Sequence, residues 1–457
     1  MTIAVSGRLR SAWRGGPLAY RSFRLLAAGQ FTSATGDSCY AIALPWLILT
    51  GHGRVELLGL VLACYGVPRT ALIPVGGMLS DRIGARPLML VADAIRCAGV
   101  GALALVALRH HASLLGLAPL GALTGAAEGL FIPPSYALMP LLLPPGQLQA
   151  GNAIASAMTG GGSLIGPALG GPLVALAGPA CAFAVDAASF AVSAATLALI
   201  PGRRAPRVAR LRWPGRVERP DGPADSGGSM SSGGSMSSGR LWALIRRQRL
   251  LQVMLVVVIA ANLASDGTLE VAMPALAHAR YGAIGYGTMM ACLAAGSVAG
   301  NLAGLRGRAP RVRSGRVLTW STPAVRSALS FVLEGVAIMV LPFLGGLPGA
   351  AAASFALGLT NGFGNVLFIT LLQQWAPAAL LGRVMSLIML AAWGMLPLSA
   401  VLAGALVLRF GAAPYFPAAG AVVAAAVLAA LSQREFRSLG VAAELPRELE
   451  QPVSTRR

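Results

Sequence analysis

Charged residues inside long apolar stretches are the side chains of this sequence that could do chemistry. Asp37, Arg69 and Glu128 each lie near the middle of such a stretch. A charge at the centre of a membrane-spanning helix costs at least about 2.5–3.5 kcal/mol. Asp266 and Glu270 are four residues apart, so they share one face of a helix. We therefore predict that these five residues line a membrane cavity that binds protons or a substrate.

The depth of Asp37 and Arg69 suggests that they pair. At about 1.5 Å per helical residue, both lie ~18–20 Å from one membrane surface, a little beyond the middle of a ~30 Å core. Their helices follow one another in the chain. We expect an intramembrane ion pair between them, either part of the cavity or a static lock between two helices.

Glu128 has no basic neighbour in the sequence and lies at mid-depth, 12 residues before Pro140. Because desolvation favours the neutral form of a carboxyl group, Glu128 could take up and release a proton, or bind a cation. The alternative is a glutamate that is held by hydrogen bonds in the helix packing. Asp266 and Glu270 lie towards the other surface, as an acidic pair for a cationic substrate or as a solvated pair at the cavity mouth.

Four more charged residues in the apolar segments are weaker candidates. Asp186 and Glu334 stand alone in their segments. Asp93 and Arg96 are three residues apart near one end of theirs, so we expect them to serve the adjacent cytoplasmic turn rather than the cavity.

The composition indicates a membrane protein. Hydrophobic residues make up 56% of the 457 residues and charged residues 11%, whereas soluble domains carry about 25% charged residues. The net charge is +20 and every basic residue is an arginine, but no basic stretch is interleaved with aromatics as in a nucleic-acid-binding module. The cysteines and histidines lack metal-ligand spacing. We therefore expect no nucleic-acid partner, metal, cofactor or enzyme active site.

The apolar segments predict an all-α membrane protein with twelve transmembrane helices in two six-helix bundles. Each segment is about 20 residues or longer, enough to cross a bilayer. The expected spans are 24–50, 55–79, 87–108, 113–140, 149–177, 179–200, 249–277, 283–305, 320–346, 349–375, 383–409 and 413–432.

Arginines concentrate in alternate loops, which predicts the orientation. By the positive-inside rule both termini and the central linker are cytoplasmic. We expect the protein to be in the cell membrane. The linker contains the six residues 227–232 twice in succession, a Gly/Ser-rich sequence expected to be flexible. The predicted divisions are an arm (1–22), a first bundle (23–200), the linker (201–248), a second bundle (249–432) and a tail (433–457).

A glycine-rich charged turn at 76–87 separates the second and third spans. Glycines allow a very short connection between helices, and an unpaired Asp or Arg must stay at the membrane surface. We predict that this turn forms a cytoplasmic gate together with the start of the eleventh span. The gate residues are Gly77, Asp81, Arg82, Gly84, Arg86 and Arg383.

Two motifs give the chain a resemblance to the major facilitator superfamily. The turn matches G-x-x-x-D-R-x-G-x-R, which resembles the signature loop between helices two and three of that family. The fifth span matches G-x-x-x-G-P-x-x-G-G, which resembles the antiporter motif of its exporters. The residues of the second motif are Gly162, Gly166, Pro167, Gly170 and Gly171. Within the family the chain is most similar to drug:proton antiporters, among them bacterial macrolide and multidrug exporters.

A third motif of those antiporters, L-x-x-x-R-x-x-Q-G, is only partly matched. Glycines occupy its leucine and arginine positions, at Gly121 and Gly125, and Glu128 with Gly129 stands at its end. The usual basic partner is therefore missing from this span.

The resemblance implies a proton-driven exporter of hydrophobic small molecules, in the lipid bilayer and as a monomer. Without a lysine, the chain cannot contain the G-x-x-x-x-G-K-[ST] loop that binds ATP. The alternatives are a solute importer on the same fold and a non-transporting membrane sensor or lipid scramblase.

Overall fold

A computed structural model of the chain describes residues 16–52, 55–109, 114–144, 147–201, 248–306, 322–375 and 381–437. The predicted linker between 201 and 248, most of the predicted arm and the tail beyond 437 lie outside these residues. The predicted domain boundaries therefore stay predictions.

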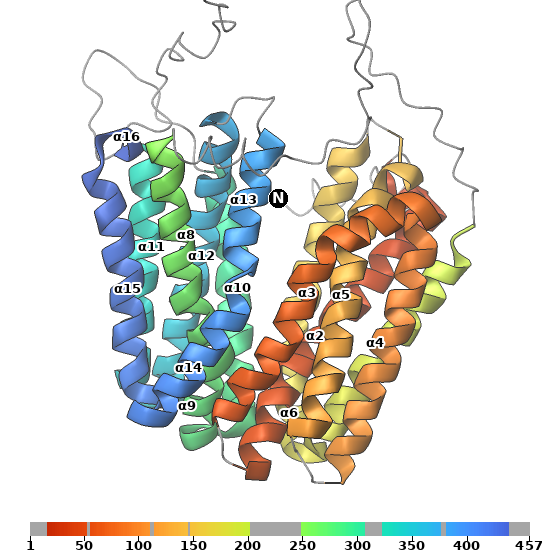
Figure 1. The fold of residues 1–457 in the computed structure, drawn as a ribbon, viewed down its shortest axis with the longest axis horizontal. Helices are drawn as coiled ribbons and strands as arrows, with labels where there is room; N and C mark the ends of the chain where they lie inside the picture. Colours follow the sequence, from red (N-terminus) through yellow and green to blue (C-terminus); the bar gives the residue numbers. More distant parts are fainter. Residues whose placement is uncertain are drawn as a thin grey trace, which may run out of the picture.

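Every element in the described residues is a helix, and the helices form two groups (Figure 1). The first half begins with the short η1 (Pro17–Ala19) and continues with α2 (Arg21–His52), α3 (Val55–Ile83), α4 (Ala85–Leu108), α5 (Leu114–Leu142) and α6 (Leu148–Leu199). The second half consists of α8 (Arg249–Gly267), η3 (Thr268–Ala272), α9 (Met273–Arg280), α10 (Gly282–Arg306), α11 (Pro323–Val340), η5 (Leu341–Phe343), α12 (Gly346–Trp375), α13 (Leu381–Trp393), α14 (Leu396–Phe410), α15 (Ala412–Ser432) and α16 (Arg434–Arg437).

The long helix α6 contains two spans that meet at Gly178. This residue has φ +80°, a backbone angle that glycine adopts without strain. The contacts of α6 with α2 run in opposite order on its two sides: Gly162–Phe31, Gly170–Cys39, Asp186–Gly36 and Ser193–Gly29. The chain therefore reverses at Gly178, where the sequence predicts the boundary between spans five and six.

The count of spans confirms the predicted fold class. Ten helical segments in the described residues are long and apolar enough to cross a membrane, and one of them, Ala150–Leu199, contains both spans of α6. The 32-residue α2, whose polar residues lower its hydropathy, adds the twelfth. The protein is an all-α membrane protein with twelve spans in two bundles.

The outer surface of the bundle is apolar, as contact with lipid requires. Large apolar side chains point away from the protein, among them Leu105 (63% exposed), Leu115 (89%) and Val256 (63%). Exposed leucines and valines on this scale would be a liability in water and match the hydrocarbon core of a bilayer.

The two ends of the bundle differ in how the halves meet. We call the end with the Gly84 turn, where the described residues begin at Gly16 and end at Arg437, the terminus end, and the opposite one the Gly178 end. At the Gly178 end one hydrophobic core contains residues of both halves. At the terminus end each half has a core of its own. The halves accordingly converge towards one end and diverge towards the other in Figure 1.

Glycines make the contact at the Gly178 end close. A Cβ on Gly59 of α3 would overlap the backbone carbonyl of Ala400 in α14, and one on Gly404 would lie 3.3 Å from the Cα of Glu56. Further along the same contact between α3 and α14, which we call the α3–α14 seam, Gly66 meets the ring of Pro397. The Cβ position of Gly66 lies 2.9 Å from Pro397 Cγ. The structure is therefore closed at the Gly178 end and open at the terminus end.

Replacing Gly59 should destabilise this closure. The extra atoms of Gly59→Val need room that the Ala400 carbonyl occupies, and such overpacking costs about 1–3 kcal/mol, equivalent to a roughly 5–150-fold shift between conformations. We expect faster labelling of Ala400→Cys by a thiol reagent, in a background without the native cysteines. Gly101→Val is the matched control, because the Cβ position of Gly101 meets no atom within 4 Å. Equal labelling in both variants would contradict the prediction.

Candidate functional site

The five predicted site residues all keep contact with solvent. Asp37 on α2 is exposed, and the side chains of Arg69 on α3 and Glu128 on α5 are 20% and 23% exposed. Asp266 on α8 and Glu270 on η3 are partly buried. All five lie well inside their spans, and the cavity that the sequence predicts around them stays a prediction.

An ion pair between Arg69 and Glu128 lies at the centre of the site. The Arg69 Nε is 3.1 Å from Glu128 Oε1. Its N–H makes no hydrogen bond in the described part of the chain, so the attraction is electrostatic rather than a charge-assisted hydrogen bond. The Tyr65 hydroxyl, one helical turn before Arg69, donates a hydrogen bond to Glu128 Oε2.

The partner of Arg69 corrects the sequence prediction, which paired it with Asp37. Consecutive helices need not be packing neighbours: α2 lies mainly against α6, and α3 mainly against α5. The glycines of α5 bring the latter two helices into backbone contact at every turn, in the pairs Gly121–Val61, Gly125–Tyr65 and Gly129–Arg69.

The same series of glycine contacts explains why the L-x-x-x-R-x-x-Q-G motif has no arginine in this chain. A side chain at Gly125 would overlap the Tyr65 carbonyl. The basic partner of Glu128 comes instead from the neighbouring helix, as Arg69. Glu128 is thus neither unpaired nor held by hydrogen bonds alone.

Arg69 also reaches the second half. Its guanidinium carbon lies 5.2 Å from the centre of the Trp393 ring, at the end of α13, within the range of a cation–π interaction. Its charge also interacts with Asp37 in its own half and with Asp266 and Glu270 across the interface. One guanidinium therefore faces four carboxyl groups, of which only Glu128 is in direct contact.

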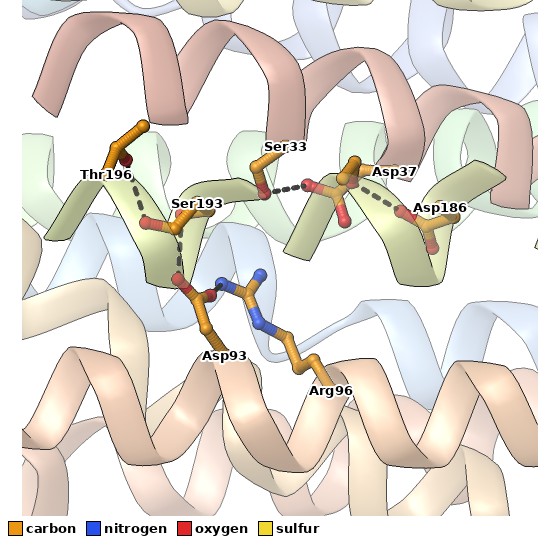
Figure 2. A network of polar contacts seen from close by, with 8 residues as sticks. Ser33, Asp37, Asp93, Arg96, Asp186, Ser193 and Thr196 are labelled. Atoms are coloured by element: carbon orange, nitrogen blue, oxygen red, sulfur yellow. Dashed lines mark hydrogen bonds and ion pairs between the residues drawn. The ribbon is translucent and has the colours of Figure 1, made fainter. Parts of the chain in front are cut away.

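A second group of charges, around Asp93 and Arg96, lies inside the first half and adjoins Asp37 (Figure 2). Asp93 is 0% and Arg96 4% exposed; they form an ion pair on α4, and Ser193 of α6 donates a hydrogen bond of 2.7 Å to Asp93. The Arg96 guanidinium carbon lies 4.2 Å from the ring centres of both Phe131 and Phe190. The prediction that Asp93 and Arg96 serve the cytoplasmic turn is therefore wrong. They join α4 to α5 and α6.

Asp186 belongs to the same interior region. It is 1% exposed and accepts a hydrogen bond of 3.3 Å from Ser189 on its own helix. On the facing helix α2, the Ser33 hydroxyl donates a hydrogen bond of 3.5 Å to Asp37 of the same helix. In Figure 2 these two aspartates lie near each other, between α2 and α6. Gly36 permits this approach, since a Cβ there would lie 2.5 Å from Asp186 Oδ1.

Glu334 is the corresponding buried acid of the second half. It is 3% exposed, and its carboxylate accepts hydrogen bonds from Ser265 at 3.3 Å and from Asn361 at 3.2 Å. These donors come from α8 and α12, so Glu334 connects three helices. A sequence signal for it was weak, because the donors are more than 25 residues away on either side.

The residues of the fifth-span motif are packing residues in the structure. Gly162, Gly166 and Gly170 all face α2, at one-turn spacing; a Cβ on Gly162 would lie 2.7 Å from the Phe31 carbonyl oxygen. Gly171 faces the second half, where its Cβ position is 3.0 Å from the Ala283 carbonyl oxygen of α10. Pro167 contributes a carbonyl to the same contact, against Gly287. The motif thus joins α6 both to α2 and to the other half.

The predicted gate residues lie at the terminus end but do not gather into one cluster. Gly84 has φ +96° and links α3 directly to α4. Arg86 donates hydrogen bonds of 2.8 Å to the carbonyls of Leu197 and Ala198, at the end of α6.

The remaining gate residues make fewer contacts. Asp81 and Arg82 are exposed. Gly77 has room for a side chain, whereas its neighbour Gly76 is in close contact with α5. The side chain of Arg383 lies outside the described residues, so the contact of Asp81 with the start of α13 stays a prediction.

The described residues contain no group of three or more His, Cys, Asp or Glu side chains that could hold a metal ion. The five charges of the site are Arg69, Glu128 and Asp37 in the first half and Asp266 and Glu270 in the second, so one cation faces four acids.

The sequence model of the Major Facilitator Superfamily matches residues 26–397. The multidrug efflux pump Tap of Mycobacterium bovis is 27% identical over 157 residues, which is 33% of this chain and 37% of Tap. Tap of Mycolicibacterium fortuitum is 26% identical over 166 residues, 35% and 39% of the two chains. An uncharacterized transporter of the same type from Bacillus subtilis, YfiS, is 26% identical over 33% of this chain and 35% of its own. The chain thus spans well under half the length of the curated relatives that it matches.

Solved structures share the fold at low sequence identity. The nucleoside transporter NupG superposes with a TM-score of 0.68 at 11% identity, over 90% of this chain and 99% of its own. A bacterial homologue of the iron transporter ferroportin, in its inward-facing state, gives 0.65 at 15% identity, over 92% and 99%. The peptide transporter POT gives 0.68 at 15% identity, over 92% and 96%.

Removing both partners of the Arg69–Glu128 pair should cost less stability than the two single removals added together. Arg69→Met leaves Glu128 without its cation, and Glu128→Met leaves both Arg69 and the Tyr65 hydroxyl without a partner, each at about 1–3 kcal/mol. We expect the double variant to lose less than the sum of the single losses. The measurement is thermal unfolding of the purified protein in detergent.

Arg409→Met is the matched control for this cycle, because Arg409 is an exposed arginine at the end of α14. Its loss should leave the unfolding midpoint nearly unchanged. Additive losses in the double variant would show that the two side chains do not interact.

Proposed function

Because this chain belongs to the Major Facilitator Superfamily, we propose that it is a secondary active exporter of hydrophobic small molecules, driven by protons that move in the opposite direction. The observation that carries the proposal is the Arg69–Glu128 pair, a titratable ion pair that faces the second half at the point where the halves diverge. The similarity to the multidrug efflux pump Tap supports export of drug-like molecules.

In the proposed coupling, protonation of Glu128 makes Arg69 exchange this acidic partner for other acidic residues nearby. A proton on Glu128 removes the charge that holds the guanidinium in the first half. Its remaining acidic neighbours are then Asp37, on α2, and Asp266 with Glu270, across the interface. Arg69 is drawn towards the second half, and the relative stability of the two closed states changes. Deprotonation of Glu128 returns Arg69 to its first partner.

The energy available from this exchange is sufficient for resistance to a toxic compound. One charge that crosses about 100 mV releases ~2.3 kcal/mol. At about 1.4 kcal/mol for each factor of ten, one proton per cycle could sustain roughly a 40-fold gradient of a neutral substrate.

The arginine distribution supports an orientation with the terminus end in the cytoplasm. In that orientation the present structure is open to the cytoplasm and closed to the outside. A hydrophobic substrate would meet Asp37, Arg69 and Glu128 from the cytoplasmic side, and the loss of contact between α3 and α14 would open its exit.

Glu128→Gln should abolish proton coupling while it preserves the shape of the side chain. Survival of cells on a panel of hydrophobic antibiotics, with and without an uncoupler, first identifies a substrate. In proteoliposomes with an imposed pH gradient, we expect the variant to lose substrate-dependent proton flux, because a glutamine binds no proton.

Glu334→Gln is the matched control for this experiment. It makes the same change at a buried glutamate that interacts with Ser265 and Asn361 rather than with the cavity. Coupled flux should persist in it. Unchanged proton dependence in Glu128→Gln would refute the assignment of Glu128, and accumulation of the substrate in whole cells would indicate an importer.

Asp81→Asn should weaken the closed state of the terminus end. We propose that the Asp81 carboxylate meets the N-terminus of α13 when this end closes, an interaction of about 0.3–1 kcal/mol. Its loss would shift the population about two- to fivefold towards the open state and reduce transport. Spin labels at Met78→Cys and Arg434→Cys would report a larger share of long distances.

Asp81→Glu, which keeps the charge, is the control for this variant and should behave like the wild type. Full transport and an unchanged distance distribution in Asp81→Asn would leave the 76–87 loop as a turn without a gating role.

A further inference from the structure

A pocket of about 410 Å³ lies in the seam between α6 of the first half and α10 of the second. It is a separate feature from the charged site. Its walls are Leu164, Ala168 and Pro172 on α6, Ile284, Thr288, Ala291, Cys292 and Ala295 on α10, and Phe355 on α12. On each of the first two helices these residues recur at about one-turn spacing, so the pocket is a groove that follows α10 for about 16 Å and α6 for about 12 Å.

The groove is shaped by the way in which the two helices cross. They are closest at Gly171 and Gly287, where a Cβ on Gly171 would lie 3.0 Å from the Cα of Gly287. The groove extends from this crossing towards the terminus end, along Leu164 and Ala295. It therefore occupies the wedge that forms because the halves touch at one end and separate at the other.

The groove opens onto the surface that faces lipid. Two of its apolar lining residues are exposed, Ile284 (50%) and Phe355 (39%). They are continuous with the apolar belt of the bundle. No lining residue is charged, and the only lining hydroxyl, that of Thr288, donates a hydrogen bond to the Ile284 carbonyl. The lining therefore offers nothing to a polar headgroup and suits a hydrocarbon chain.

We propose that this groove is a binding site for one acyl chain of a membrane phospholipid, and that the lipid stabilises the conformation seen here. Closing the terminus end would bring α6 and α10 together and eliminate the wedge. A ligand that binds only one of two conformations shifts the equilibrium towards it. The lipid chain is thus a conformational effector that leaves the charged site untouched, whatever the transported molecule is.

The free thiol of Cys292 provides a direct measurement at the site. In a variant with Cys292 as its only cysteine, purified in detergent, added phosphatidylethanolamine should slow alkylation by N-ethylmaleimide. Protection follows 1 + [L]/Kd, so we expect alkylation about tenfold slower at a lipid concentration ten times the Kd. A single cysteine at Ala425→Cys, exposed on α15, should show no comparable protection.

Filling the groove provides the second measurement. Native mass spectrometry should show that Ala168→Phe/Ala291→Phe retains one phospholipid fewer per chain than the wild type, whereas Ala425→Phe retains the wild-type number. Gly59→Val, which lies on α3 and is expected to favour the other conformation, should also retain less lipid.

Equal protection of Cys292 and Ala425→Cys would overturn the proposed site, because the groove would then be ordinary lipid-facing surface. Equal lipid retention by the filled variant would overturn it as well. A retained hydrophobic substrate or a second copy of the chain in place of lipid would reassign the groove. If Gly59→Val retained as much lipid as the wild type, the proposed preference of the lipid for one conformation would be refuted, and the binding site itself would stand.

Discussion

Arg69 carries a positive charge halfway along a membrane-spanning helix, and the arrangement of the site follows from the need to balance it. A lone charge at this depth would cost several kcal/mol. Glu128 supplies the direct counter-charge, Tyr65 and Trp393 offer ring faces, and Asp37, Asp266 and Glu270 complete an acidic surrounding. This surrounding comes from both halves, so the charge of one guanidinium is balanced by residues on either side of the interface.

Glycine contacts decide where the halves can meet. The α3–α14 seam depends on Gly59 and Gly404, and the α6–α10 seam on Gly171 and Gly287. Both use backbone contact, which has no flexible side chain to absorb a shift. A rocking motion would therefore have to break these contacts as a unit. The α6–α10 seam also contains the apolar groove.

Two kinds of buried charge coexist in this protein, with different consequences. Asp93, Arg96 and Glu334 have hydrogen-bond or ion-pair partners on several helices and almost no exposure, so they hold the helices of each half together. The charges between the halves keep partial exposure and fewer contacts. Exposure, rather than the presence of a charge in a span, separates the two.

The sequence by itself determined the membrane class, the twelve spans and the turns, because hydropathy and glycine positions act locally. It also singled out the five charges that remain exposed. Tertiary structure alone decided their pairing: Arg69 meets Glu128 since the glycines of α5 fit the backbone of α3, a match between segments some 60 residues apart. Likewise, Asp93 and Arg96 look like turn residues until α6 provides Ser193 and Phe190. Spacing along a helix shows which side chains share a face, but not which helix lies opposite.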